Sequence, residues 1–398
     1  MTKSGAHTPF VAIACGGTGG HLFPGLAVAE QLQKRGCAVA LLISPKEVDQ
    51  QAVKSASGME IITLPAVGLQ NHNYLSFARS FWQSWRRSNT IFKSRPPQAV
   101  LAMGGFTSAP PILAARKFGA RTFLHESNTI PGRANRFLAR YVHEAFIGFP
   151  GAASLRARKI TVTGTPVRSQ FQPGAAAPCR AAFRLESDRP TILVMGGSQG
   201  ASGINDLILS ALPLLGDRTA TWQWLHLTGP GDVKKMEQAY AARGFKAVVK
   251  PFLQEMDLAL GAATMAVSRA GASSLAEIAA VRLPSLLVPY PAAADNHQFF
   301  NAQAFASTGA ARMLEQKNAS PDEVAALLGE LIEAPAVRAK IQTALAQWHA
   351  PRAAEQIAEI ILAAIARHAD ETAGAVRPAS GSGAGAGESV KLAVSTGV

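Results

Sequence analysis

The chain has 398 residues and a formal net charge of +13; 48% of its residues are hydrophobic and 16% are charged. This length and apolar content predict two domains of ordinary size, and no apolar run is long enough to cross a bilayer as a helix. Cys15, Cys37 and Cys179 lie far apart without metal-ligand spacing, which favours a reducing compartment over a disulfide framework or a zinc site.

The positive charge is concentrated in the first half of the chain. Residues 1–170 contain 20 Lys and Arg against 6 Asp and Glu, whereas the remaining residues contain 19 against 20. A nucleic acid, an anionic membrane surface or a phosphorylated substrate would each account for such a basic half, as would a solvated surface without a partner. Nucleic acid is disfavoured because the basic half has no aromatic stacking motif and no known basic module.

Short apolar runs alternate with helical periodicity along the chain, which is typical of a parallel α/β protein. A first series of strands is predicted near 9–15, 37–43, 98–103, 121–125, 145–149 and 160–163, and a second near 190–195, 222–227, 246–250, 264–267 and 285–289. The polar stretch 169–189 separates the two series, and helical patterns fill 320–368. The expected fold is two Rossmann-like, doubly wound domains that face each other across a cleft.

Glycine-rich turns follow four of the predicted strands, at 16–20, 104–108, 196–201 and 268–274. Glycines let backbone amides approach a ligand, and a helix N-terminus favours an anion, so these strand ends predict a phosphate-binding cleft. None of the turns fits the G-x-G-x-x-G pattern, and no Walker A sequence occurs. A hydride-transferring enzyme and a P-loop NTPase are therefore disfavoured.

Polar side chains at these strand ends are the candidate site residues. Glu277 lies in the helix after the fourth turn, where a carboxylate can take both hydroxyls of a ribose; a solvated helix residue is the alternative. His125 and Glu126 end a strand, although His125 equally suits a capping or core role. Asp295 is expected to be the N-cap of a later helix, and Gln298, one turn in, to recognise sugar hydroxyls.

Seven motifs together carry a resemblance to a known family. GGTGGHLFPGLAVAEQL, GGFTSAP, LHESN, VTGTPVR, GGSQGASGIND, SRAGASSLAE and ADNHQFFNA occur in the order and spacing of the MurG family, and the resemblance spans about residues 8–365. Ser127 and Thr165 depart from the Gln and Asn that are common in the family. The family's members move N-acetylglucosamine from UDP-N-acetylglucosamine to lipid-linked N-acetylmuramyl-pentapeptide in bacterial peptidoglycan synthesis. The resemblance implies an inverting glycosyltransferase of GT-B architecture.

The resemblance also implies that the two domains bind different substrates. Residues 1–168 would bind the acceptor and the membrane, and residues 169–349 would bind UDP-N-acetylglucosamine. A final helix over 350–368 would pack back onto the first domain. The low-complexity stretch 370–398 is expected to be disordered.

Donor contacts are assigned by the same resemblance. They come from the first turn, from polar residues of both domains and from the helix after the fourth turn: Thr18, Gly19, Gly20, Asn128, Arg168, Ser198, Leu253, Ala272, Ser273, Ser274, Leu275, Ala276, Glu277 and Gln298. Arg168 and Ser198 would meet phosphate and Glu277 the ribose. Asn128 and Gln298 would meet the sugar, and backbone groups near Leu253 the uracil.

An inverting transfer needs a general base and stabilisation of the departing diphosphate. His21 is the predicted base because it ends the first turn and can titrate near neutrality, and Glu126 is the alternative. No Asp-x-Asp occurs, so helix amides, Arg168 and Ser198 are expected to hold the diphosphate, with no metal and no cofactor. A sugar-nucleotide-binding module without turnover is the alternative to an enzyme.

The segment 74–87 is amphipathic and is expected to lie on an anionic membrane surface; an ordinary packing helix is the alternative. Its apolar residues approximate one helical face: Leu75, Phe77, Phe81, Trp82 and Trp85. We therefore expect a peripheral protein on the cytoplasmic face of the inner membrane. Its expected partners are UDP-N-acetylglucosamine, undecaprenyl-pyrophosphoryl-N-acetylmuramyl-pentapeptide, the anionic membrane surface and cell-wall synthesis proteins, with no nucleic acid.

Overall fold

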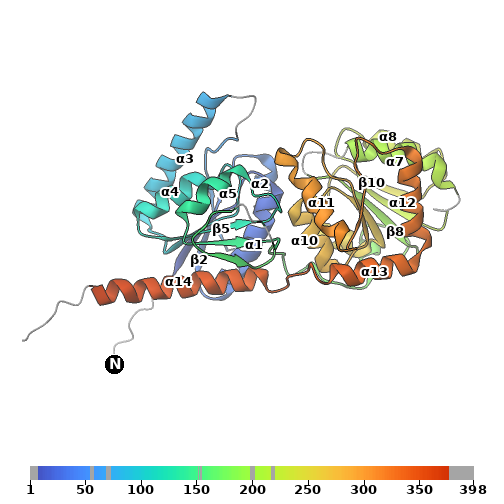
Figure 1. Cartoon of the computed structure of the whole chain (residues 1–398). Coiled ribbons are helices and arrows are strands. Elements are labelled where there is room, and N and C mark those ends of the chain that lie inside the picture. The colour runs from blue at the N-terminus through green and yellow to red at the C-terminus, as the bar shows by residue number, and fades with distance from the viewer. Residues whose placement is uncertain are drawn as a thin grey trace, which may run out of the picture.

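The computed structural model describes residues 8–53, 58–68, 73–150, 152, 155–197, 202–216 and 220–375. Within them, the strands form two parallel sheets, one in each half of the chain, with helices on both faces of each sheet (Figure 1). The strand orders are β3-β2-β1-β4-β5-β6-β7 and β10-β9-β8-β11-β12-β13. In each sheet the strand order reverses next to the first strand of the domain, between β1 and β4 and between β8 and β11. A doubly wound domain binds ligands at this point, beyond the carboxyl ends of the strands. The predicted pair of Rossmann-like domains is confirmed.

The first sheet has a hydrophobic core on each face because β1 is buried on both sides. Its strands are β1 (Phe10–Ala14), β2 (Ala38–Ile43), β3 (Glu60–Thr63), β4 (Ala99–Ala102), β5 (Arg121–Glu126), β6 (Glu144–Ile147) and β7 (Ile160–Val162). Val11 and Ile13 pack under α1 on one face, whereas Ala12 and Ala14 belong to the core on the other face, together with Phe92. The helices are α1 (Gly19–Lys34), α2 (Glu47–Ala52), α3 (Tyr74–Ser94), α4 (Ala109–Lys117), α5 (Arg133–Leu138) and the 3-10 helix η2 (Ala139–Tyr141).

The second sheet is built on the same plan around a single large core. Its strands are β8 (Thr191–Met195), β9 (Gln223–Leu227), β10 (Ala247–Lys250), β11 (Met265–Ser268), β12 (Ser285–Leu287) and β13 (Arg312–Met313). The helices are α6 (Ala176–Ala182), α7 (Ser202–Leu215), α8 (Val233–Ala241), α9 (Met256–Ala262), α10 (Ala272–Val281), the 3-10 helix η4 (Ala294–Asn296), α11 (His297–Ser307), α12 (Pro321–Glu333) and α13 (Pro335–Leu345). Helix α6, which lies in the polar stretch 169–189 between the two predicted strand series, packs on α9 of the second domain.

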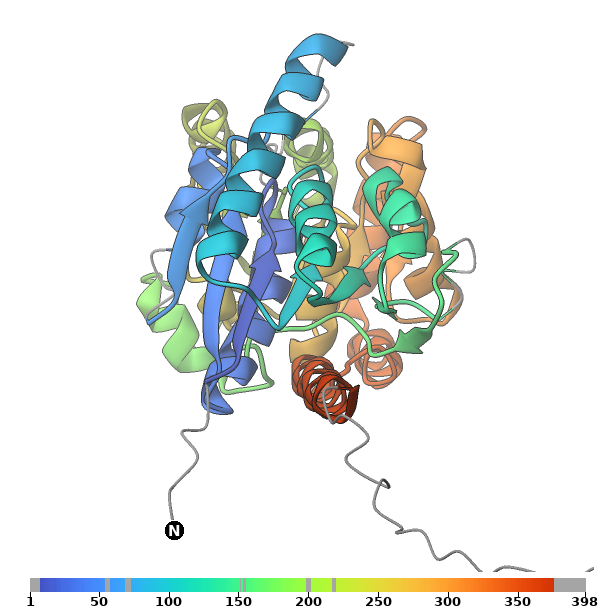
Figure 2. The same ribbon diagram turned by 90° about the vertical axis from the view of Figure 1, so that its left-hand side faces the viewer.

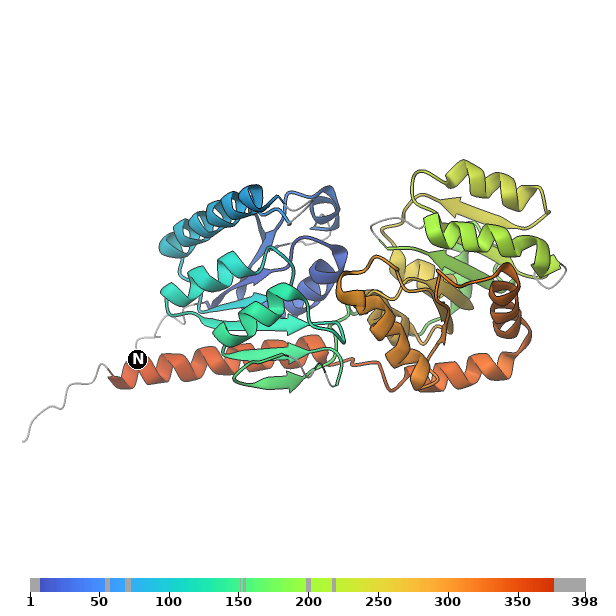
Figure 3. The ribbon, with the colours of Figure 1, turned by 45° about the horizontal axis from the view of Figure 1, so that its top comes forward.

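The last helix, α14 (Ala353–Ala375), returns to the first domain. It contacts α1 and β5, and Ile357 and Ile361 are fully buried there. Figure 2 shows α14 end-on, on the face of the first sheet opposite α3 and α4, and Figure 3 shows it running along that domain. The helix includes residues 370–375, which had been expected in a disordered tail; the rest of that stretch lies outside the described residues.

Two strands were not predicted, and both are marginal. β3 (Glu60–Thr63) is an edge strand whose first two residues are exposed, so its apolar signal is short, and β13 (Arg312–Met313) has only two residues. Among the described residues, the structure has no helix with the length and apolar composition needed to cross a membrane.

Candidate active site at the domain seam

The turns after β1 and β11 meet between the domains because the helices that follow them, α1 and α10, are in contact. Both helices begin directly at their turns, at Gly19 and Ala272. The first backbone amides of a helix have no acceptor within it and carry the positive end of the helix dipole. The seam therefore presents two sets of amide donors suited to an anion, one from each domain.

The turn before α1 is held in one conformation by both neighbouring segments. Gly17 has a φ of +112°, which side-chain-bearing residues rarely adopt, and its N–H donates to Asp49 Oδ2 at 2.6 Å. Thr107 Oγ1 donates to the Gly16 carbonyl at 2.7 Å. With the backbone pinned in this way, Thr18, Gly19 and Gly20 remain partly or fully exposed at the start of α1.

His21 lies in the first turn of α1, so the helix starts before this residue and not after it as predicted. Its Nδ1 is 3.2 Å from Thr18 Oγ1, and its ring lies against Gly104 and Gly105, where a Cβ on Gly105 would come within 2.9 Å of the ring. Burial lowers the pKa of His21, while the charge of Glu126 opposes that shift. A neutral imidazole at the seam is suited to accept a proton.

Glu126 ends β5 with both carboxylate oxygens already occupied. Oε1 accepts from the backbone N–H and the Nδ2 of Asn128 at 2.9 and 3.0 Å, and Oε2 accepts from Gly132 N at 2.8 Å and Asn135 Nδ2 at 2.9 Å. Four hydrogen bonds saturate the carboxylate, so this geometry favours His21 over Glu126 as the base. Glu126 instead orders the loop that follows β5.

His125 is fully buried beside Glu126, and its two ring nitrogens are both engaged. Nε2 lies 3.0 Å from the Gly164 carbonyl, and Nδ1 lies 3.1 Å from Ser127 Oγ. Burial lowers the pKa of His125. These contacts tie β5 to the segment that leaves the first domain, which is the core role left open by the sequence.

The same loop is tied to the second domain by Asn301, a fully buried residue of α11. Asn301 Oδ1 accepts from the N–H and Oγ1 of Thr129 at 3.0 and 2.9 Å, and its Nδ2 donates to Asn128 Oδ1 and to the Ala270 carbonyl, each at 3.1 Å. Asn301 therefore links the loop after β5 to the turn before α10. Sequence reasoning missed it, although it lies within the quoted ADNHQFFNA motif.

Asp295 forms a second link across the seam. Its carboxylate pairs with Arg136 at 2.8 Å and with Arg133 at 3.3 Å, both on α5, and these guanidinium groups hold its pKa below the usual range. The expectation that Asp295 caps the next helix is wrong, because Asn296 occupies the N-cap of α11 and makes no side-chain cap hydrogen bond. Asp295 instead has a left-handed backbone, with φ of 50° inside η4.

In the second domain, Glu277 is half-buried on α10, one and a half turns from its start. Burial raises the pKa of Glu277 to about 7, opposed by the charge of Arg168. The Arg168 guanidinium lies 4.4 Å from the ring centroid of Phe23 and 5.1 Å from that of Phe171, and its buried Nε has no hydrogen-bond partner among the described residues. This stacked cation is available to an anion.

Gln298 and the remaining predicted donor contacts line the same edge of the second sheet. Gln298 Oε1 accepts from Ala270 N and Tyr290 N at 3.1 and 3.0 Å, which joins the two turns and leaves its amide nitrogen outside these bonds. Ala272, Ser273, Ser274 and Ala276 lie at the start of α10, the Leu275 side chain is in the core, and Leu253 is partly buried after β10. Ser198 lies outside the described residues.

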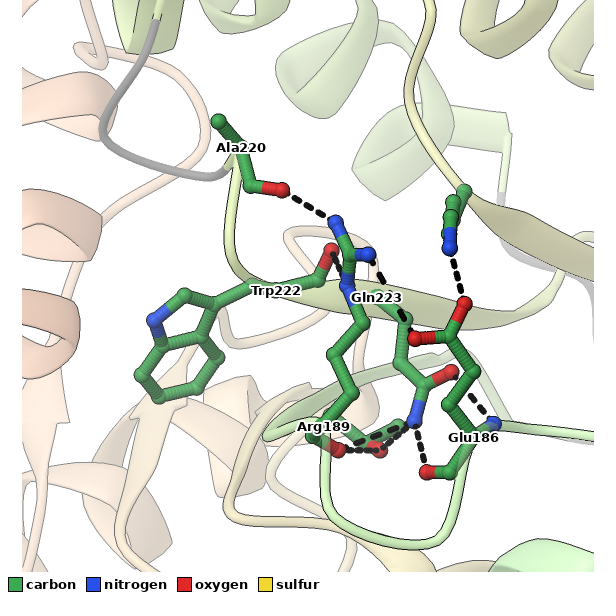
Figure 4. Close-up of polar contacts among 7 residues, drawn as sticks. Glu186, Arg189, Ala220, Trp222 and Gln223 are labelled. Atoms are coloured by element: carbon green, nitrogen blue, oxygen red, sulfur yellow. Dashed lines mark hydrogen bonds and ion pairs between the residues drawn. The ribbon is translucent and has the colours of Figure 1, made fainter.

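At the opposite edge of the second sheet, polar groups are hydrogen-bonded to one another. There, Gln223 Nε2 donates to the carbonyls of Glu186 and Arg189 at 2.8 and 2.9 Å, and Arg189 Nε donates to the Trp222 carbonyl at 2.8 Å (Figure 4). These polar groups satisfy one another and brace the start of β9. In the described part of the chain, no cluster of three or more His, Cys, Asp or Glu side chains could hold a metal ion.

The five apolar residues predicted to form one face of the 74–87 helix lie on two faces. Leu75 and Trp82 project outward and are 86% and 52% exposed. Phe77, Phe81 and Trp85 are half-buried along one flank. The reason is a stripe of buried serines four residues apart, Ser80, Ser84 and Ser88, which lies on the inner side of α3 where that helix packs on α4.

Comparisons with known proteins cover both domains. The model of the glycosyltransferase family 28 N-terminal domain matches residues 11–147, and that of the glycosyltransferase family 28 C-terminal domain matches residues 191–357. The UDP-N-acetylglucosamine--N-acetylmuramyl-(pentapeptide) pyrophosphoryl-undecaprenol N-acetylglucosamine transferase of Anaeromyxobacter sp. (strain K) is 36% identical over 364 residues, covering 89% of this chain and 93% of that protein. The transferase of the same name from Citrifermentans bemidjiense is 37% identical over 358 residues, covering 86% and 96%.

Solved structures show the same likeness. The crystal structure of Acinetobacter baumannii MurG has a TM-score of 0.71 at 27% identity and covers 89% of this chain and 99% of that one. A putative UDP-N-acetylglucosamine 2-epimerase from Listeria monocytogenes has a TM-score of 0.70 at 14% identity, over 92% of this chain and 98% of that one, and is similar in fold alone.

Proposed function

The chain belongs to the MurG family of N-acetylglucosamine transferases within glycosyltransferase family 28, and from this membership we propose that it makes lipid II. It transfers N-acetylglucosamine from UDP-N-acetylglucosamine to the 4-hydroxyl of undecaprenyl-pyrophosphoryl-N-acetylmuramyl-pentapeptide and releases UDP. The family membership, which extends over both domains, is the observation that carries this proposal. The first domain binds the acceptor and the second binds the donor.

His21 is the general base of the proposed transfer. The muramyl 4-hydroxyl oxygen attacks the anomeric carbon, its proton passes to the imidazole, and the bond from the anomeric carbon to the diphosphate oxygen breaks with its electron pair leaving on UDP. The configuration at that carbon inverts. In the tautomer that the transfer requires, Nδ1–H donates to Thr18 Oγ1 and Nε2 is the nitrogen that receives the proton; the lowered pKa keeps the ring neutral and ready to accept it.

The departing diphosphate is stabilised by fixed positive charge. The free amides at the start of α10 and the Arg168 guanidinium face the phosphates, and Ser198 adds a hydroxyl. Glu277 accepts hydrogen bonds from the ribose hydroxyls. Gln298 donates its free amide to the sugar, and backbone groups near Leu253 meet the uracil.

The first domain docks on the anionic surface of the cytoplasmic leaflet. The N-terminal turns of α3 extend beyond the rest of the domain (Figure 1 and Figure 2), and there Leu75 and Trp82 point outward, with the Arg86 guanidinium 4.7 Å from the Trp82 ring centroid. Exposed apolar side chains beside arginines suit a membrane interface. Docking brings the proposed active site to an acceptor that remains in the bilayer. The expected protein partners are cell-wall synthesis proteins that act on the same lipid.

The test is to incubate the protein with UDP-N-acetylglucosamine and a short-chain lipid-linked N-acetylmuramyl-pentapeptide. We expect one N-acetylglucosamine to be added to the acceptor, measured by mass spectrometry, with an equal amount of UDP released. Reactions without acceptor are the control. Tight UDP binding without acceptor-dependent UDP release would contradict the proposal and favour a binding module without turnover.

A further inference from the structure

Asp49 lies behind the turn that carries His21, on the short helix α2, and is fully buried. Its Oδ2 accepts three hydrogen bonds, from Gly17 N at 2.6 Å, Ser44 Oγ at 2.5 Å and Ser44 N at 3.1 Å. Its Oδ1 is buried and has no hydrogen-bond partner among the described residues. A buried carboxylate with one unsatisfied oxygen is costly, which is a reason to look for a role beyond packing.

Lys46 binds the other backbone group of the same residue, Gly17. Its Nζ donates to the Gly17 carbonyl at 3.2 Å, and the ammonium lies 5.2 Å from the ring centroid of Phe106. Gly17 is thus held by its amide through Asp49 and by its carbonyl through Lys46, in a conformation that only glycine adopts readily. Only three residues separate Gly17 from His21, so any relaxation of Gly17 displaces the imidazole.

We propose that Asp49 is a positioning residue for the transfer reaction: it holds the Gly16–Gly17 turn in place and thereby orients the imidazole of His21, while Lys46 holds the Gly17 carbonyl. This inference rests on the proposed function, because it assigns Asp49 a role in the step that His21 performs. Asp49 itself touches neither substrate.

The charges that face His21 predict the sign of each effect. Burial lowers the pKa of His21; Glu126 on β5 and Asp49 on α2 raise it, whereas His297 on α11 and Lys46 before α2 lower it. Removing the charge of Asp49 should therefore lower the pKa of His21, and removing the charge of Lys46 should raise it. A purely structural role would not predict opposite shifts from two neighbouring residues.

The experiment compares Asp49→Asn with Lys46→Met in the acceptor-dependent assay, measuring kcat and the pH profile of kcat/KM. In Asp49→Asn, kcat should fall about 10-fold or more, since small misplacements of a catalytic group are costly. The acid limb of its profile should move to lower pH by about half a unit, and that of Lys46→Met to higher pH by a similar amount. UDP affinity, measured by calorimetry, should stay within about twofold of wild type in both.

Glu144→Gln is the matched control. Glu144 is, like Asp49, a buried carboxylate of the first domain, but it lies at the start of β6, where it accepts from Lys159 Nζ at 3.0 Å and from Thr161 Oγ1 at 2.6 Å. This variant should lower thermal stability without moving the acid limb. It therefore separates a general loss of stability from a specific effect on His21.

The outcomes distinguish this inference from the proposed function. A wild-type protein without acceptor-dependent UDP release overturns the proposed function itself. An active wild type with an unmoved acid limb in Asp49→Asn overturns the positioning role, even if kcat falls. If Asp49→Asn does not fold, Lys46→Met provides the test. A shift of the acid limb of its kcat/KM profile to higher pH supports the positioning role, and an unchanged acid limb overturns it.

Discussion

The turns after β1 and β11 each place one titratable side chain at the domain seam, and burial acts on the two in opposite directions. It lowers the pKa of His21 and raises the pKa of Glu277 to about 7. In both cases the low-dielectric seam favours the neutral form. One scaffold therefore yields a proton acceptor in one domain and, in the other, a carboxylate that depends on Arg168 or a ligand for its charge.

The domains differ more in what they expose than in how they fold. Their sheets share the same order around the first strand, but the helix between β3 and β4 is α3, with 21 residues, whereas its counterpart between β10 and β11 is α9, with 7. Seven residues suffice for that crossover. The extra turns of α3, in the basic half of the chain, are therefore available for another surface.

The largest expected effect is on His21. His21→Ala should reduce turnover about 100-fold or more, because the proposed base is lost, while UDP affinity stays close to wild type. Steady-state kinetics and calorimetry measure the two quantities. Turnover near the wild-type value would mean that the base lies elsewhere, and Glu126→Gln would then be the next variant.

Glu277 should show the converse behaviour. Glu277→Gln should raise the donor KM about 10- to 100-fold, because a charged acceptor of two hydroxyl hydrogen bonds is replaced by a neutral one. The acceptor KM is the internal control and should change little. An unchanged donor KM in both Glu277→Gln and Arg168→Ala would contradict the proposed donor site.

The proposal that the exposed turns of α3, which α9 lacks, bind a membrane can be tested by measuring binding to lipid vesicles. Leu75→Ser with Trp82→Ser should weaken binding to anionic vesicles about 10-fold, because two exposed apolar side chains no longer enter the interface. Turnover should fall on a long-chain acceptor and stay close to wild type on a short-chain one.

Phe252→Ser is the matched control for that double variant, since Phe252 is an apolar residue of the second domain that is 55% exposed. It should leave vesicle binding unchanged. Equal losses on long-chain and short-chain acceptors would assign the exposed part of α3 to another role.

The opposite pKa shifts also predict opposite effects on stability. The pKa of His21 is lowered on folding, so its burial costs stability below about pH 6.5; the pKa of Glu277 is raised, so its burial costs stability as pH rises above about 4.5. His21→Ala should therefore gain thermal stability at pH 5 relative to pH 8, and Glu277→Gln the reverse, each by about 2–4 °C. Scanning calorimetry without substrates measures the thermal stability of both variants at pH 5 and pH 8. A change of the same sign in the two variants would contradict the opposite pKa shifts of His21 and Glu277.

Local patterns were enough to predict two Rossmann-like domains and most strands of their sheets, because apolar runs and glycines act on their own neighbourhood. The contacts that organise the site join distant residues. Gly17 and Asp49 are 32 positions apart, and Thr129 and Asn301 are 172 apart. The burial pattern of α3 was also unpredictable, because small serines face α4 while larger apolar side chains lie at the flank and outside. Partners of this kind depend on the packed fold.

The smallest expected effect concerns the ion-paired link across the domain seam between η4 and α5. Asp295→Asn removes the ion pairs with Arg133 and Arg136 but keeps a side chain that tolerates the left-handed backbone, so the change isolates the charge. Because these pairs are largely exposed, we expect the KM values for both substrates to rise only about two- to fivefold. Added salt screens such pairs, so the difference from wild type should shrink at high ionic strength. In a double-mutant cycle with Arg136→Gln, the two losses should be less than additive, which is the signature of a shared interaction. Fully additive losses that persist in salt would mean that Asp295 acts through its backbone conformation and not through α5.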